Sequence, residues 1–102
     1  MRVQDTCPIA ATAKIIAQKW TLLIVRDLMG GPKRFSELER SLQGISPRTL
    51  SDRLSHLERE GLVQRRNYSE APPRVEYSLT TKGRDLLPVI EALRAYGEKW
   101  LC

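Results

Sequence analysis

Residues 35–61 of this chain of 102 residues hold two short helical patterns joined by a tight turn. The first pattern runs over about 35–42 and starts with Ser36-Glu37-Leu38-Glu39, which has the spacing of a capping box. The turn is Gln43-Gly44-Ile45. The second pattern starts at Ser46-Pro47, an N-cap followed by a proline at the first helical position. This order predicts a helix-turn-helix.

The second helix, which we expect to end at Gly61, has one apolar and one polar face. Leu50, Leu54 and Leu57 lie within about 60° of one another at 100° per residue. A helix that reads bases in the major groove needs an apolar face against its own domain and a polar face toward DNA. A solvated helix face has the same pattern, but the flanking elements favour DNA binding. The candidate contacts on this helix and its cap are Ser46, Arg48, Thr49, Ser51, Asp52 and Arg53.

A β-hairpin is expected to follow this helix. Residues 62–68 and 75–79 are rich in Val and Tyr and alternate as short strands do. The two prolines at 72–73 remove two backbone donors, so 69–74 is a loop. Two helices and then a hairpin predict a winged helix-turn-helix, mainly α with a small β-hairpin. The candidate phosphate contacts outside the second helix are Lys33, Arg34, Ser36 and Arg74; Arg65 and Arg66 are adjacent, so one faces outward.

Charge and hydropathy narrow the class of protein. Seventeen Lys and Arg against twelve Asp and Glu leave a net charge of +5, and the isoelectric point is about 9.6. A domain this basic is typical of proteins that bind nucleic acid. No run of about 18 apolar residues is present, and the N-terminus lacks the pattern of a secretory signal. We therefore expect a protein of the cytoplasm with no membrane partner.

The two ends of the chain carry apolar stripes that a small helix-turn-helix core does not need. A first helix from Pro8 places Ile9, Ala13, Ile16 and Trp20 on one stripe, and a second, apolar helix covers about 20–29. A last helix from Thr80 or Thr81 to about 101, kinked at Pro88, has an apolar arc of about 140°. Two chains that pair these helices bury both stripes; a monomer folded back at Pro88 is the alternative. The expected dimer-interface residues are Ile9, Ala13, Ile16, Leu86, Ile90, Leu93, Gly97 and Trp100.

The chain resembles the HxlR-type transcriptional regulators over nearly its whole length. The motifs that carry the resemblance are Cys7-Pro8-Ile9, Lys19-Trp20, Gly31-Pro32-Lys33-Arg34-Phe35-Ser36-Glu37-Leu38, Gly44-Ile45-Ser46, Leu57-Glu58-Arg59-Glu60-Gly61-Leu62-Val63 and Pro72-Pro73-Arg74-Val75-Glu76-Tyr77-Ser78-Leu79-Thr80. The resemblance implies a homodimeric winged-helix regulator, spanning 7–102 with a flexible segment at 1–6, that binds a pseudo-palindromic operator in double-stranded DNA. One departure is Gln18, where a glycine commonly precedes the Lys-Trp pair.

Cys7 and Cys102 are the chemically ambiguous residues. A cysteine just before the first helix has its thiolate favoured by the helix dipole, which raises its reactivity. The resemblance adds that some members sense electrophiles or oxidants with a cysteine at this place. Cys7 is therefore a candidate redox sensor, acting either through a bridge to Cys102 of a second chain or through modification of its thiol, or else a small buried apolar residue.

Catalysis is not expected. Two thiols and the single His56 cannot fill a structural zinc site, and Gly30-Gly31 runs into Pro32 rather than into a phosphate-binding loop. We expect no metal and no cofactor. The alternative to a DNA-binding regulator is a winged-helix module that binds protein and whose basic face is incidental.

Overall fold

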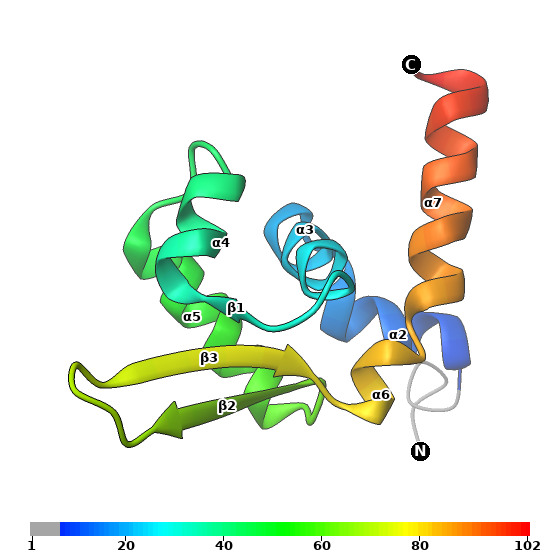
Figure 1. The fold of residues 1–102 in the computed structure, drawn as a ribbon. Helices are drawn as coiled ribbons and strands as arrows, with labels where there is room; N and C mark the ends of the chain where they lie inside the picture. Colours follow the sequence, from blue (N-terminus) through cyan, green and yellow to red (C-terminus); the bar gives the residue numbers. More distant parts are fainter. Residues whose placement is uncertain (1–6) are drawn as a thin grey trace.

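The computed structural model describes residues 7–102, so the segment expected to be flexible, 1–6, lies outside the described residues. A small antiparallel sheet lies along one side of a group of helices, and the last helix projects away from them (Figure 1). The order and bounds of the elements are α2 (Pro8–Ile16), α3 (Lys19–Leu28), β1 (Lys33–Arg34), α4 (Phe35–Ser41), α5 (Pro47–Arg59), β2 (Val63–Tyr68), β3 (Arg74–Leu79), α6 (Thr81–Arg84) and α7 (Leu87–Trp100).

The core forms where α3, α4 and α5 pack together and onto the sheet. Helix α3 contributes Ile24 and Val25, which are fully buried, and α5 contributes Leu50, Leu54 and Leu57, which are at most 1% exposed. Leu38 of α4 completes this centre. The expected fold class is confirmed: the chain is mainly helical, with a winged helix-turn-helix at its centre.

Two of the expected helix starts are confirmed at the level of hydrogen bonds. Ser46 Oγ accepts a bond from the Thr49 N–H at 3.1 Å, which caps α5. Thr80 Oγ1 accepts one from the Gly83 N–H at 3.1 Å, which caps α6. Helix α5 ends at Arg59 with Glu60 as its C-cap, and the next residue, Gly61, has a φ of +78°, in the left-handed region that glycine adopts without strain.

The capping box predicted at Ser36 and Glu39 is wrong. Helix α4 begins at Phe35 with Arg34 as its N-cap residue, and Glu37 Oε1 accepts a bond from the Arg34 N–H at 2.7 Å. The helix starts earlier because Arg34 is held extended in a strand that the sequence did not reveal. That strand, β1, makes the sheet three-stranded in the order β1-β3-β2 rather than a simple hairpin. Two residues are too few to show a strand period.

The terminal helices also differ from the expectation. The chain bends by 85° between α2 and α3, so Trp20 belongs to α3 and does not continue the stripe of α2. The last helix is interrupted rather than kinked: α6 ends at Arg84 and α7 begins at Leu87, with Pro88 in its first turn. Proline at that position leaves no helical hydrogen bond unmade, so it starts a helix instead of bending one.

Candidate nucleic-acid interface

Helix α5 presents a polar face to solvent along its first turns. Opposite its three buried leucines, Arg48, Ser51 and Asp52 are exposed. Ser46 is exposed as well, and Thr49 and Arg53 are half-buried. The Ser46 hydroxyl also donates to Thr49 Oγ1 at 2.9 Å, so these two side chains are partly engaged in the cap. Arg48 is therefore the residue of this turn whose long side chain extends hydrogen-bond donors into solvent.

The candidate residues that precede α5 lie at the junction of β1 and α4. Arg34 and Ser36 are exposed there, and Lys33 is half-buried. In the sheet Lys33 pairs with Tyr77, and Arg34 pairs with Glu76. The sheet therefore places the Arg34 side chain beside a carboxylate of the central strand.

The wing, which we define as β2, β3 and the loop 69–73, carries its charges on two faces. Val63 and Leu79 pair with each other and are both buried, so the alternating positions Arg65 and Tyr77 share their face of the sheet. Arg66 pairs with Glu76 on the opposite face. Both arginines are exposed, in agreement with the expectation that one of them points outward.

Arg74 is more constrained than its sequence position suggested. Its guanidinium lies 3.2 Å from Glu70 and 3.8 Å from Glu76, and it stacks on the ring of Tyr68. The residue that closes the wing loop is thus held by two carboxylates and an aromatic ring. Arg65 and Arg66 also belong to the wing, and among the described residues neither has a carboxylate within 4 Å. The sequence alone did not indicate that these two arginines are less engaged than Arg74.

Tyr77, on the central strand of the sheet, has a shifted pKa. Burial raises the pKa of the Tyr77 hydroxyl above its ordinary value, the Arg65 charge opposes that shift, and the Glu58 carboxylate adds to it. The hydroxyl therefore stays protonated at neutral pH. It serves as a neutral part of the sheet and not as an acid or base.

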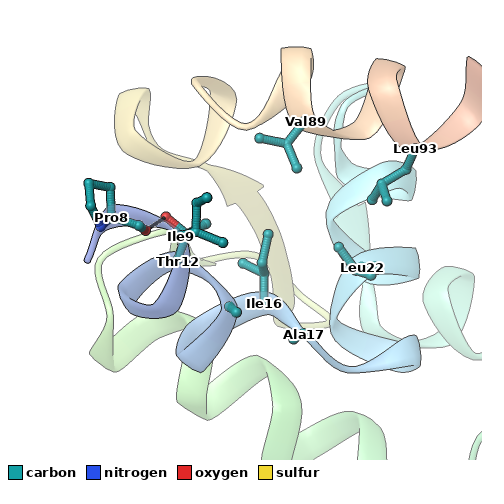
Figure 2. A pocket seen from close by; sticks show the side chains of 9 residues that line it. Pro8, Ile9, Thr12, Ile16, Ala17, Leu22, Val89 and Leu93 are labelled. Atoms are coloured by element: carbon teal, nitrogen blue, oxygen red, sulfur yellow. Dashed lines mark hydrogen bonds between the residues drawn. The ribbon is translucent and has the colours of Figure 1, made fainter. Parts of the chain in front are cut away.

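An apolar groove lies on the other side of the molecule, between α2, α3 and α7. Its volume is about 530 Å³, and Figure 2 shows Ile9 and Ile16 of α2 and Val89 and Leu93 of α7 lining it. Ile9 is 80% exposed and Leu93 is 49% exposed. Farther along α7, Tyr96 and Trp100 are more than 60% exposed.

The expected dimer-interface residues fall into three groups by burial. Ile16 and Ile90 are 7% exposed and belong to the chain's own core, so they offer little surface to a partner. Leu86 and Gly97 are half-buried. The residues that leave apolar or small side chains in solvent are Ile9, Ala13, Leu93 and Trp100.

Both cysteines are free thiols. Cys7 is half-buried at the N-cap position of α2, next to Pro8 in the wall of the groove. Cys102 is exposed beyond the end of α7, at the far end of that helix from α2 (Figure 1). Within residues 7–102, no three His, Cys, Asp or Glu side chains are placed to hold a metal ion.

No single helix of the described part of the chain is long and apolar enough to cross a membrane. Helices α2 and α3 reach that length and hydropathy only together, across their 85° bend.

Comparison with known proteins identifies the family. The model of the HxlR-like helix-turn-helix family matches residues 15–102. The HTH-type transcriptional regulator YvaP of Bacillus subtilis is 40% identical over 102 residues, which cover 99% of this chain and 94% of YvaP. A MarR-family transcriptional regulator from Porphyromonas gingivalis W83 superposes with a TM-score of 0.92 at 40% identity, covering 99% of both chains.

A third comparison concerns a redox protein. The redox regulator HypR in its oxidized form has a TM-score of 0.86 to this chain at 39% identity, covering 91% of this chain and 96% of HypR. From its sequence, its fold and these matches, the chain belongs to the HxlR-like helix-turn-helix family and is a transcriptional regulator of the helix-turn-helix type.

Proposed function

We propose that this chain is a homodimeric regulator that binds a pseudo-palindromic operator in double-stranded DNA, with α5 in the major groove. The observation that carries the proposal is the division of α5 into a fully buried leucine face and a polar face headed by Arg48. An arginine at that place has the forked donor that matches the O6 and N7 acceptors of guanine. Ser51 and Asp52 lie on the same exposed turns, within reach of neighbouring base edges.

The groups around α5 are placed to bind the DNA backbone. Arg34 and Ser36 stand at the start of α4, where backbone N–H groups favour an anion. The exposed Arg65 and Arg66 lie on the wing. Lys33, Thr49, Arg53 and Arg74 complete the proposed surface, with Arg74 shaping the wing. Such cations bind phosphates irrespective of sequence, whereas α5 supplies the specificity.

The apolar groove supports the proposed dimer. Its walls of Ile9, Ala13 and Leu93, continued by Tyr96 and Trp100 on α7, are an exposed apolar surface of a size that a partner usually covers. Two copies that pair α2 and α7 bury this surface and bring two α5 helices into one assembly. A pseudo-palindromic operator matches such a two-fold pair.

We further propose that the regulator responds to an oxidant or a small electrophile through Cys7. Its similarity to a redox regulator solved in an oxidized form supports this proposal, as does the place of Cys7 beside the groove. Within one chain Cys102 lies beyond the far end of α7, so the Cys7–Cys102 bridge we propose joins two chains. We propose that the protein acts in the cytoplasm, where its DNA operator is found.

Operator selection tests the function. The purified protein is mixed with random duplexes, the bound fraction is sequenced, and affinity is measured for the selected site from low to high salt, with reductant and with oxidant. We expect an inverted repeat and an affinity that falls steeply with salt, because phosphate contacts release counterions. If no sequence is enriched, and the protein binds DNA weakly with an affinity that does not change with salt, the result supports the alternative of a protein-binding module.

A further inference from the structure

Three consecutive backbone carbonyl groups at the end of α5 are hydrogen-bonded to α6 and its cap. The Glu60 carbonyl accepts a bond from Lys82 Nζ at 2.7 Å, and the Gly61 carbonyl accepts one from Thr80 Oγ1 at 2.6 Å. The Leu62 carbonyl accepts one from the Thr80 N–H at 3.0 Å. The Thr80 hydroxyl is used twice, since it also caps α6.

These bonds add to the capping of the C-terminus of α5. The Leu62 N–H donates to the Leu57 carbonyl at 2.9 Å and the Gly61 N–H to the Glu58 carbonyl at 3.0 Å, which is the pattern of a Schellman motif. Farther along the chain, Lys82 and Thr80 bind the carbonyl groups of Glu60 and Gly61. The Lys82 ammonium thus stands at the negative end of the α5 dipole, where a cation is favoured.

Gly83 brings α6 into direct contact with the connection between α5 and β2. It is buried, and a Cβ atom at this position would overlap the Leu62 carbonyl oxygen and approach Leu79 Cδ2 to 3.0 Å. Only a glycine permits so close an approach. Helix α6 is therefore seated on the end of α5 by backbone contact as well as by side-chain bonds.

The same short helix leads directly into α7. Only Asp85 and Leu86 separate the two helices, and the Leu86 N–H donates to the Gly83 carbonyl at 3.1 Å. Figure 1 shows α6 at the base of α7, next to the end of β3. Ile90 then anchors the first turn of α7 in the core. The orientation of α7 is thereby tied to the end of α5.

We propose that Lys82 and Thr80 are positioning residues that fasten the recognition helix α5 to the dimer helix α7 and so set the distance between the two α5 helices of a dimer. The inference rests on the proposed function, a dimer bound to paired half-sites. Two recognition helices must land about 34–36 Å apart, one turn of the duplex. If the bonds between α6 and the end of α5 are lost, each α5 can change its orientation relative to α7, and the range of distances between the two α5 helices becomes wider.

The test measures affinity for duplexes whose two half-sites are separated by spacers that change one base pair at a time, and for a duplex with a single half-site. Lys82→Met keeps the stem of the side chain, which lies near Gly61, and removes the ammonium donor. We expect the preference for the best spacing over its neighbours to fall by about fivefold, while affinity for the single half-site stays unchanged. Lys82→Arg restores a charged donor and should restore the preference.

Arg84→Met is the matched control, because Arg84 is exposed on the same short helix and its side chain makes no hydrogen bond or ion pair within the described structure, while its backbone N–H bond to the Thr80 carbonyl is kept. It should keep the wild-type spacing profile. Thr80→Val, compared with Thr80→Ser, repeats the test at the second donor. If Lys82→Met fails to fold, Lys82→Gln, which is also neutral, takes its place.

The outcomes separate the two ideas. If Lys82→Met folds and keeps the wild-type spacing profile, the inference is wrong and the proposed function stands. The same holds if Lys82→Met loses affinity equally for every duplex. A wild-type protein that shows no preference for paired half-sites removes the proposed function, and the inference with it.

Discussion

Arg74 lies over the ring of Tyr68, with its guanidinium carbon 4.4 Å from the ring centroid, and the two residues face each other in the last pair of the β2–β3 ladder. The same guanidinium reaches Glu70 in the loop beyond. Arg74, which the sequence suggested as a phosphate contact, therefore also holds the wing loop closed.

Removing this stack should loosen the wing. A double-mutant cycle with Tyr68→Leu and Arg74→Met should give a coupling of about 0.5–1 kcal/mol in the free energy of unfolding, the range for a solvent-accessible cation–π pair. Urea unfolding of the four proteins measures it. A coupling of zero means that the two side chains are neighbours without a stabilising interaction.

Arg48→Ala should weaken operator binding by about 1–3 kcal/mol and relax the preference at one base pair of each half-site. The reason is the loss of a forked donor from the exposed first turn of α5. Affinities for the selected operator and for random DNA give the answer, with Arg59→Ala, an exposed arginine at the other end of the helix, as the control. Equal losses on both DNAs would make Arg48 a phosphate contact.

Leu93→Asp should yield monomers or insoluble protein, because it places a carboxylate in the apolar groove between α2 and α7. Sedimentation of the purified variant reports its oligomeric state. Ala95→Asp adds the same charge at an exposed position about 160° around the helix axis from Leu93 and should leave the dimer intact. A soluble Leu93→Asp dimer would falsify the proposed interface.

Oxidation should change operator affinity in the wild type and not in Cys7→Ser, because Cys7 stands directly before α2, a helix that lines the proposed dimer groove. Binding is measured before and after peroxide or a quinone, with non-reducing gels alongside. Cys102→Ser should also abolish the response if a bridge between chains carries it. A response that survives in Cys102→Ser alone points to modification of the Cys7 thiol, and an unresponsive wild type makes Cys7 a packing residue.

Gly83→Ala should lower the free energy of unfolding by about 1–3 kcal/mol, since the added methyl group must displace the Leu62 carbonyl or the Leu79 side chain. Thermal or urea unfolding measures the loss. Gly30→Ala is the control: its Cβ would make only ordinary contacts, the nearest at 3.5 Å, and the expected change is within about 0.5 kcal/mol. A Gly83→Ala protein as stable as the wild type contradicts the close seating of α6.

The recognition helix was predictable because its signals are local. A cap at Ser46, a proline, leucines at helical spacing and the glycine at 61 specify α5 and its two ends through bonds and packing that span only a few residues. The apolar character of the last helix was equally visible, since amphipathicity depends on spacing alone. The motifs of the family are local in the same way, and the matches to known proteins agree with them.

The remaining features arise where segments distant in the sequence meet, and they could not be predicted before the packing of those segments was known. β1 exists because Lys33 and Arg34 find partners on β3, and that pairing moves the start of α4. Arg74 is held by Tyr68 and Glu76, and Lys82 reaches the end of α5, through contacts that depend on how the strands and helices are brought together. Local propensity records which conformations a short segment prefers, but a hydrogen bond or ion pair between remote residues forms only after packing has fixed their relative positions.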